Sequence, residues 1–211
     1  GVMRHEKLSR KEADARAIEM LDRVGIENPA ARLTQYTHGF SGGQRQRIMI
    51  ASALMGRPRL LIADEPTTAL DVTIQAQILT LLGELQADLG LSLLLITHDL
   101  GVVAAIANDV AVMYAGRIAE HAPAVDLFAT PRHPYTKGLL AAIPVPGVTP
   151  RGSELPAIPG RVPGLIGTMQ GCAFRDRCAI AGPECAHDPV PRISAGQGQF
   201  VECVKAAEVV A

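Results

Sequence analysis

The sequence predicts an α/β fold in which helices cover a parallel sheet, followed by a second, smaller domain that is irregular. Two short apolar runs, 59–64 and 91–97, have the length of buried strands, and an amphipathic stretch over 72–89 lies between them. A strand–helix–strand order with apolar strands is typical of a parallel sheet covered on both faces. Beyond residue 120 the composition changes, because twelve of the 15 prolines and all four cysteines lie there. We therefore expect domains over 1–120 and 121–211.

The remaining elements are predicted from caps and turns. Ser9 and Glu12 have the S-x-x-E spacing of a capping box, so a helix should begin after Ser9 and end near Gly25. A second helix should run from about Ser41 to Leu54 or Met55, before Gly56 and Pro58. After the second strand we expect a short helix over 100–107, then a hairpin with strands 110–114 and 117–120.

The composition excludes several classes of protein. Hydrophobic residues make up 48% and charged residues 19% of the 211 residues, as in a globular protein. The net charge of -1 and the 3% aromatic content argue against a nucleic-acid partner. No apolar run reaches the roughly 20 residues that cross a bilayer, and no signal peptide is recognisable, so a cytoplasmic protein is expected.

Polar side chains come directly after the two predicted strands. Asp64 and Glu65 end the first, and His98 ends the second. Open α/β sheets bind ligands at the carboxyl ends of their strands, where Asp64 could hold Mg²⁺ through water and Glu65 could polarise an attacking water. Taken singly, the acidic pair could be a solvated turn and His98 a surface residue. Asp71, in the acidic loop before the helix over 72–89, could be merely a helix cap.

A glycine-containing segment opens the second helix. Ser41 is a good N-cap, and the glycines of Ser41-Gly42-Gly43-Gln44 would let phosphates approach the free backbone N–H groups. By itself this segment is usually a loop entering a helix. It becomes informative because the strand-end carboxylates, the acidic loop and His98 come after it in that order.

In this order, the four segments resemble the signature motif, Walker B, D-loop and switch histidine of ATP-binding-cassette (ABC) ATPases. Phe40 stands where Leu usually precedes Ser-Gly-Gly, which is a mild departure. The segments 133–144, 158–160, 171–174 and 177–178 resemble the extension of dipeptide and oligopeptide importer ATPases, so the resemblance covers nearly the whole chain.

The resemblance implies a partial P-loop NTPase-type sheet with a helical subdomain, and a site for ATP and Mg²⁺. Glu65, His98 and Asp64 would act on ATP held by their own chain, with Asp71 in the D-loop. Ser41, Gly42, Gly43 and Gln44 would close over ATP held by a second ABC ATPase subunit. Two transmembrane permeases and, indirectly, a peptide-binding protein are the further partners implied, with the chain peripheral at the cytoplasmic face of the membrane.

No G-x-x-x-x-G-K-[ST] phosphate loop occurs in the 211 residues. Phosphoryl transfer depends on that loop, its Lys and Mg²⁺. We therefore expect that this chain alone neither binds ATP tightly nor hydrolyses it, and that its sheet exposes apolar surface.

The four cysteines, Cys172, Cys178, Cys185 and Cys203, lie close together in the sequence. A reducing compartment disfavours disulfides, and the paired C-x2-4-C spacing usual for zinc is absent. Four thiolates suit an iron–sulfur cluster, and some importer ATPases of the resembled kind hold a [4Fe-4S] cluster in this extension. Zinc and free thiols remain alternatives to the cluster.

Two other functions compete with the peptide-importer ATPase. An ABC protein of DNA repair would need coiled-coil insertions or a basic groove, and neither is present. A nonenzymatic iron–sulfur or regulatory module derived from a truncated ABC ATPase is favoured only by the missing phosphate loop. The sequence does not identify the transported solute.

Overall fold

The chain folds into two compact units, Gly1–Asp99 and Leu100–Ala211. The structure is a computed structural model that describes residues 1–144, 147–150, 152–164, 167, 169–196 and 198–205. Each unit has a hydrophobic core of its own. The domain boundary expected at residue 120 falls inside a strand of the second unit, β4 (Arg117–Pro123). The assignment of 1–120 and 121–211 to two functional domains stays a prediction.

The first unit begins with helices. They are α1 (Val2–His5), α2 (Arg10–Arg23), α3 (Pro29–Arg32), the 3-10 turn η1 (Thr37–Gly39) and α4 (Gly42–Leu54). The capping box predicted at Ser9 is present, because its side chain accepts the N–H of Glu12 and the Glu12 carboxylate accepts the N–H of Ser9. The helix predicted from Ser41 is also confirmed, with Ser41 as its N-cap.

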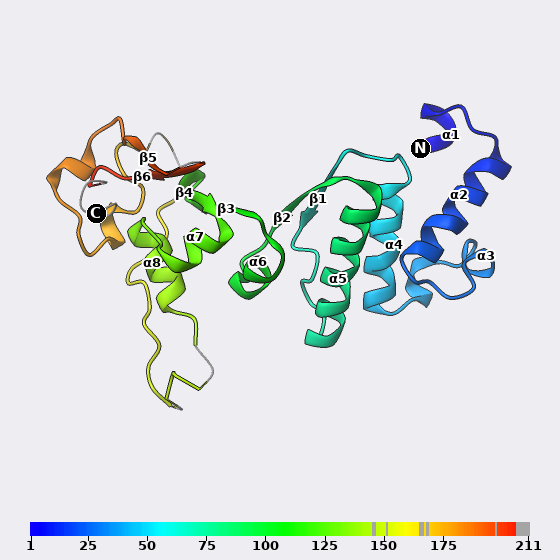
Figure 1. Cartoon of the computed structure of the whole chain (residues 1–211), viewed down its shortest axis with the longest axis horizontal. Helices are drawn as coiled ribbons and strands as arrows, with labels where there is room; N and C mark the ends of the chain where they lie inside the picture. The colour runs from blue at the N-terminus through cyan, green and yellow to red at the C-terminus, as the bar shows by residue number, and fades with distance from the viewer. Residues whose placement is uncertain (145–146, 151, 165–166, 168, 197, 206–211) are drawn as a thin grey trace. The chain divides into compact units, whose positions relative to one another are not determined.

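The strand–helix–strand unit forms as predicted. It consists of β1 (Leu60–Asp64), α5 (Val72–Leu89) and β2 (Ser92–Ile96), and the two strands pair in parallel with Asp64 opposite Ile96. Asp71 caps α5, and Gly90 ends it in the left-handed conformation, which glycine adopts at little cost. Figure 1 shows α4 and α5 beside each other next to the two strands.

Only one face of this two-stranded sheet is covered by the described residues. Leu61 and Leu93 join the core, which α2, α4 and α5 supply with residues such as Leu54, Ile78 and Leu82. On the other face the side chains are exposed by 46–59% of their area: Leu60 51%, Ile62 59%, Leu94 48% and Ile96 46%. We call these four residues the open sheet face. The expectation of a sheet covered on both faces is therefore wrong for the described residues, whereas the expected exposure of apolar sheet surface is found.

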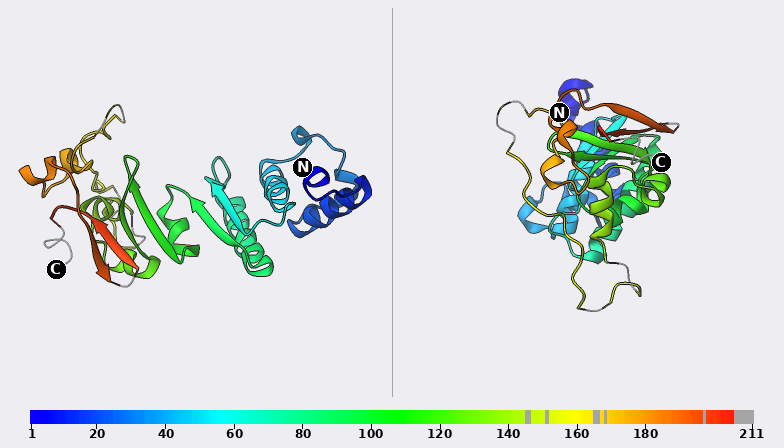
Figure 2. Two further views of the ribbon diagram at one scale, coloured as in Figure 1. Left: turned by 90° about the horizontal axis from the view of Figure 1, so that it is seen from above. Right: turned by 90° about the vertical axis from the view of Figure 1, so that its left-hand side faces the viewer.

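The second unit is built on an antiparallel sheet. Its elements are α6 (Leu100–Ile106), β3 (Asp109–Tyr114), β4, α7 (Ala124–Ala129), α8 (Pro134–Ala141), the 3-10 turns η2 (Arg175–Arg177) and η3 (Pro183–Ala186), β5 (Arg192–Gly196) and β6 (Gln199–Glu202). The four strands lie in the order β3-β4-β6-β5 (Figure 2). The β3–β4 hairpin with Ala115-Gly116 at its turn is confirmed, but α7, α8, β5 and β6 were not predicted.

A buried carboxylate fixes the start of α8. Glu120 is 2% exposed, and its carboxylate accepts the backbone N–H of Arg132 at 2.7 Å and of His133 at 2.9 Å. The Nδ1 atom of His133 in turn accepts the N–H of Tyr135 at 3.0 Å, so His133 is the N-cap of α8. Burial lowers the pKa of His133 to about 4, which keeps the ring neutral. The His-Pro-Tyr-Thr segment thus has a structural role in this unit.

Candidate functional site

Three of the predicted site residues meet at the carboxyl ends of β1 and β2. Asp64 is the last residue of β1, and Glu65 comes next, with its N–H donating to the carbonyl of Ile96 at 2.8 Å. His98 lies two residues beyond the end of β2. Because the strands are parallel and in register, their ends lie at the same edge, as the sequence predicted.

The carboxylate of Glu65 has a partner on each oxygen. Its Oε2 accepts the hydroxyl of Thr68 at 2.8 Å, and its Oε1 lies 3.0 Å from Nδ1 of His98. These two hydrogen bonds, that of Thr68 before that of His98, hold the pKa of Glu65 below its ordinary value. Glu65 is therefore an exposed, ionised acceptor that can orient a water molecule.

The backbone of Glu65 is in an uncommon conformation. Its φ is +45°, in the left-handed region that non-glycine residues rarely adopt. The turn after it is closed by the N–H of Thr68, which donates to the carbonyl of Glu65 at 3.1 Å. Such strain occurs often at functional sites, where surrounding contacts hold the residue in place. Here the tight turn brings the hydroxyl of Thr68 within hydrogen-bonding distance of the Glu65 carboxylate.

The Ser41–Gln44 segment is held by its own capping box. Ser41 Oγ accepts the N–H of Gln44 at 3.3 Å, and Gln44 Oε1 accepts the N–H of Ser41 at 3.0 Å. The two glycines differ in their surroundings. A Cβ atom on Gly43 would lie 2.7 Å from Cγ2 of Ile74, whereas one on Gly42 would meet Leu70 at an ordinary 3.5 Å. Gly43 is therefore required for α4 to pack against α5, and Gly42 is not.

Asp71 lies in the same neighbourhood. Its Oδ1 accepts the N–H of Ile74 at 3.0 Å, so its side chain is used as the cap of α5. A Cβ atom built on Gly42 would meet Leu70 and one on Gly43 would meet Ile74, so the Ser41–Gln44 segment lies beside the residues that flank Asp71. The structure thus brings two of the predicted motifs together at the amino ends of α4 and α5.

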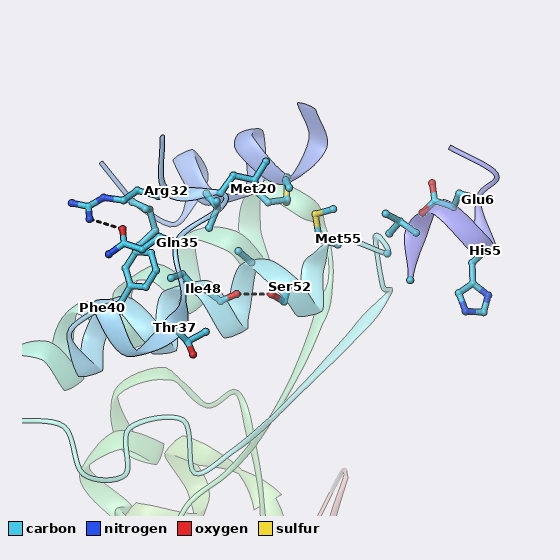
Figure 3. Close-up of a pocket in the computed structure, with 18 residues that line it drawn as sticks. His5, Glu6, Met20, Arg32, Gln35, Thr37, Phe40, Ile48, Ser52 and Met55 are labelled. Atoms are coloured by element: carbon cyan, nitrogen blue, oxygen red, sulfur yellow. Dashed lines mark hydrogen bonds between the residues drawn. The ribbon is translucent and has the colours of Figure 1, made fainter. Parts of the chain in front are cut away.

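The first unit also contains a pocket of about 740 Å³ that the sequence did not indicate. Figure 3 shows it between α2 and α4, with Met20 and Met55 among its apolar side chains and Arg32, Gln35 and Ser52 among its polar ones. Its lining comes from residues 1–56 and does not include Asp64, Glu65 or His98. Because this pocket lacks the strand-edge carboxylates, we place the candidate chemistry at the strand edge.

The four cysteines of the second unit converge on one small cavity. Cys172, Cys178, Cys185 and Cys203 line it together with His133 and Phe174, and Cys172 donates its N–H to the carbonyl of Cys185 at 2.8 Å. Burial raises the pKa of Cys172 and Cys178, and it raises the pKa of Cys203 to about 11. As arranged here, these three thiols are protonated at neutral pH.

This arrangement does not fit the expected metal group. The cavity has a volume of about 10 Å³, which is close to the space of a single water molecule. Among the residues that the structure describes, no group of three or more His, Cys, Asp or Glu side chains is arranged to hold a metal ion. The expectation of a [4Fe-4S] cluster, or of zinc, at the four cysteines therefore finds no support, and neither does the nonenzymatic iron–sulfur module built on it.

Two family descriptions match the chain. "ABC transporter" matches residues 2–68, and "Oligopeptide/dipeptide transporter, C-terminal region" matches residues 119–185. The oligopeptide transport ATP-binding protein OppD of Salmonella typhimurium is 48% identical over 207 residues, which are 98% of this chain and 61% of the relative. The chain belongs to the ABC transporter family and carries the oligopeptide/dipeptide transporter C-terminal region.

Other comparisons agree with this assignment. The dipeptide transport ATP-binding protein DppD of Bacillus subtilis is 55% identical over 177 residues, covering 84% of this chain and 52% of the relative. The solved structure of cbiO1 from Clostridium perfringens, part of the ABC transporter complex cbiONQ, matches 58% of this chain and 47% of its own at 36% identity, with a TM-score of 0.52. The chain thus has an ABC ATPase-like fold and spans about half to three fifths of the length of these transport relatives.

Within this ABC chain, two features of the site were missed by sequence reasoning. The contact of Thr68 with Glu65 depends on the left-handed conformation of Glu65, and no sequence pattern predicts that conformation. Thr97 likewise accepts the N–H of Asp99 at 3.0 Å and shapes the turn around His98. A threonine within three residues of each candidate catalytic residue was the available signal.

Proposed function

We propose that this chain supplies part of the ATP-hydrolysing subunit of an importer of dipeptides or oligopeptides. The observation that carries the proposal is the convergence of Asp64, Glu65 and His98 at one strand edge, in a chain similar to peptide transport ATP-binding proteins. A carboxylate held ionised at this edge suits the orientation of an attacking water.

Each site residue has a proposed role. Glu65 polarises the attacking water, His98 holds the Glu65 carboxylate in place, and Asp64 holds Mg²⁺ through water. The Ser41–Gln44 segment and Asp71 serve the contact with a second ABC ATPase subunit, where the exposed amino end of α4 closes over the phosphates of the other subunit's ATP. Mg²⁺ supplies charge neutralisation on the phosphates when it is bound.

The proposed partners are those of a peptide importer. They are a second ABC ATPase subunit, two transmembrane permeases and, indirectly, a peptide-binding protein outside the membrane. The chain would lie at the cytoplasmic face of the membrane as a peripheral subunit. Among the described residues, no helix is long and apolar enough to span a bilayer.

We further propose that the 211 residues, assayed by themselves, do not hydrolyse ATP. They contain no phosphate loop, and hydrolysis depends on the charge and positioning that such a loop provides. The first test is therefore ATP binding and hydrolysis by this chain beside its Glu65→Gln variant. Micromolar binding that is lost in Asp64→Asn would refute the proposed inactivity.

The activity itself is tested in a hybrid protein. In it, this chain replaces the matching region of the Salmonella relative, whose unmatched part is retained. We expect the hybrid to hydrolyse ATP, and Glu65→Gln to lower the rate by about 10² to 10⁴ while ATP binding persists. Glu84→Gln makes the same chemical change on the exposed surface of α5 and should leave the rate unchanged. Equal rates for the two variants would overturn the role of Glu65.

A further inference from the structure

The Glu65 carboxylate is held from two directions, by His98, which was predicted as a site residue, and by Thr68, which was not. His98 contacts Oε1, and Thr68 donates its hydroxyl to Oε2 at 2.8 Å. Both side chains must be in place for the carboxylate plane to have a fixed orientation, because a single hydrogen bond leaves rotation about the last side-chain bond open.

The backbone gives this contact a local origin. Glu65 is anchored at its N–H to the carbonyl of Ile96, and its positive φ starts a turn that the N–H of Thr68 closes on the Glu65 carbonyl. Thr68 therefore contacts Glu65 twice, once through the backbone at 3.1 Å and once through the hydroxyl. Pro66, buried inside the turn, restricts the backbone between them.

We propose that Thr68 is a positioning residue, which fixes the orientation of the Glu65 carboxylate through its hydroxyl. It contacts no reacting atom itself; its hydroxyl occupies one carboxylate oxygen, so that the lone pairs left on the group point in a defined direction. The importance of this orientation rests on the proposed role of Glu65 in hydrolysis, but the contact itself does not.

Substitutions at Thr68 can distinguish a role of its hydroxyl as a hydrogen-bond donor from a role of its side chain in packing. A donor to the ionised carboxylate favours the charged form, so its loss must raise the pKa of Glu65. Serine keeps the hydroxyl and should keep the contact, whereas valine keeps the shape of threonine without the hydroxyl. Thr67→Val removes a hydroxyl one position away and is the matched control.

The test is a titration of the Glu65 side-chain carboxyl by ¹³C NMR in this chain, with the resonance assigned by its disappearance in Glu65→Gln. We expect the pKa of Glu65 to rise in Thr68→Val and to stay near the wild-type value in Thr68→Ser and Thr67→Val. An unchanged pKa in Thr68→Val, or an equal rise in Thr67→Val, would overturn the proposal.

Kinetics of the hybrid protein give the second readout. Thr68→Val should lower kcat by about tenfold with little change in KM, as expected for one lost hydrogen bond, and Thr68→Ser should restore most of it. A raised pKa of Glu65 with an unchanged kcat would contradict the positioning role. A hybrid that is inactive even with the wild-type sequence would instead contradict the proposed function, while the titration still decides whether Thr68 holds Glu65.

Discussion

The Oε1 atom of Glu65 lies 3.0 Å from Nδ1 of His98, although the two residues are 33 positions apart in the sequence. The parallel pairing of β1 with β2 closes this separation, because it places the ends of both strands at one edge. Both side chains are open to solvent, with 46% of Glu65 and 81% of His98 exposed. The pair can therefore receive a ligand from outside without rearrangement of the core.

His98→Ala is expected to raise the pKa of Glu65, because it removes a hydrogen bond and a favourable charge interaction from the carboxylate. Thr68→Val removes the other hydrogen bond on this carboxylate and is the variant to compare with it. The carboxyl titration by ¹³C NMR measures both. Gln75→Ala, which removes the hydrogen bond from the Gln75 amide to Asp99, serves as a control. An unchanged pKa of Glu65 in His98→Ala would contradict this prediction.

Gly43→Ala should destabilise the first unit by about 1–3 kcal/mol, because the new methyl group would overlap with Cγ2 of Ile74. Gly42→Ala should be neutral or slightly stabilising, since its methyl group has room and alanine favours a helix. Urea unfolding of both variants measures the difference. Ile74→Ala removes Cγ2, so Gly43→Ala should cost less free energy of unfolding in an Ile74→Ala background than in the wild type. Strictly additive changes in the free energy of unfolding would argue against the contact.

The open sheet face should make this chain self-associate, because four apolar side chains are exposed side by side on two paired strands. Replacing Ile62 and Leu94 together with Thr should reduce the association and change the free energy of unfolding little, since Thr also favours strands. Light scattering at several concentrations measures the association. Leu61→Thr, on the covered face at 8% exposure, should instead destabilise the unit by about 2–4 kcal/mol. Unchanged association in the double variant would show that another surface is responsible.

Acid should weaken the second unit through His133. Burial lowers the pKa of His133 to about 4, below its ordinary value of 6.5. Between these two pH values, His133 is protonated in the unfolded chain and neutral in the folded chain. The stability associated with a neutral His133 is fully present above about pH 6.5 and is lost as the pH falls toward 4. At pH 5 the loss is about 2 kcal/mol.

His133→Asn tests this dependence, because asparagine can cap α8 without titrating. Unfolding by urea at pH 7 and at pH 5 should show a stability difference between wild type and variant that shifts in favour of the variant at the lower pH. A difference that is the same at both pH values would rule out His133 as the titrating group.

Local sequence signals predicted the first unit well. The capping box at Ser9, the N-cap at Ser41, the period of apolar residues over 72–89 and the glycine at position 90 all act over a few residues, so they are readable without knowledge of the fold. The second unit was predicted less well. Strand β4 pairs with β6 across about 80 residues, and no local pattern around Gln199–Glu202 indicates that partner.

The sequence by itself determined the order of motifs, the helices with their caps, and the membership of the ABC family that this order carries. It also placed Asp64, Glu65 and His98 at strand ends, since apolar runs that stop at polar residues mark those ends. Only the tertiary structure showed that the Thr68 hydroxyl contacts the Glu65 carboxylate, that a methyl group on Gly43 would meet Ile74, and that the four cysteines line one small cavity. Each of these depends on distances of a few ångströms between side chains, which are set by the turns and packing of the folded chain.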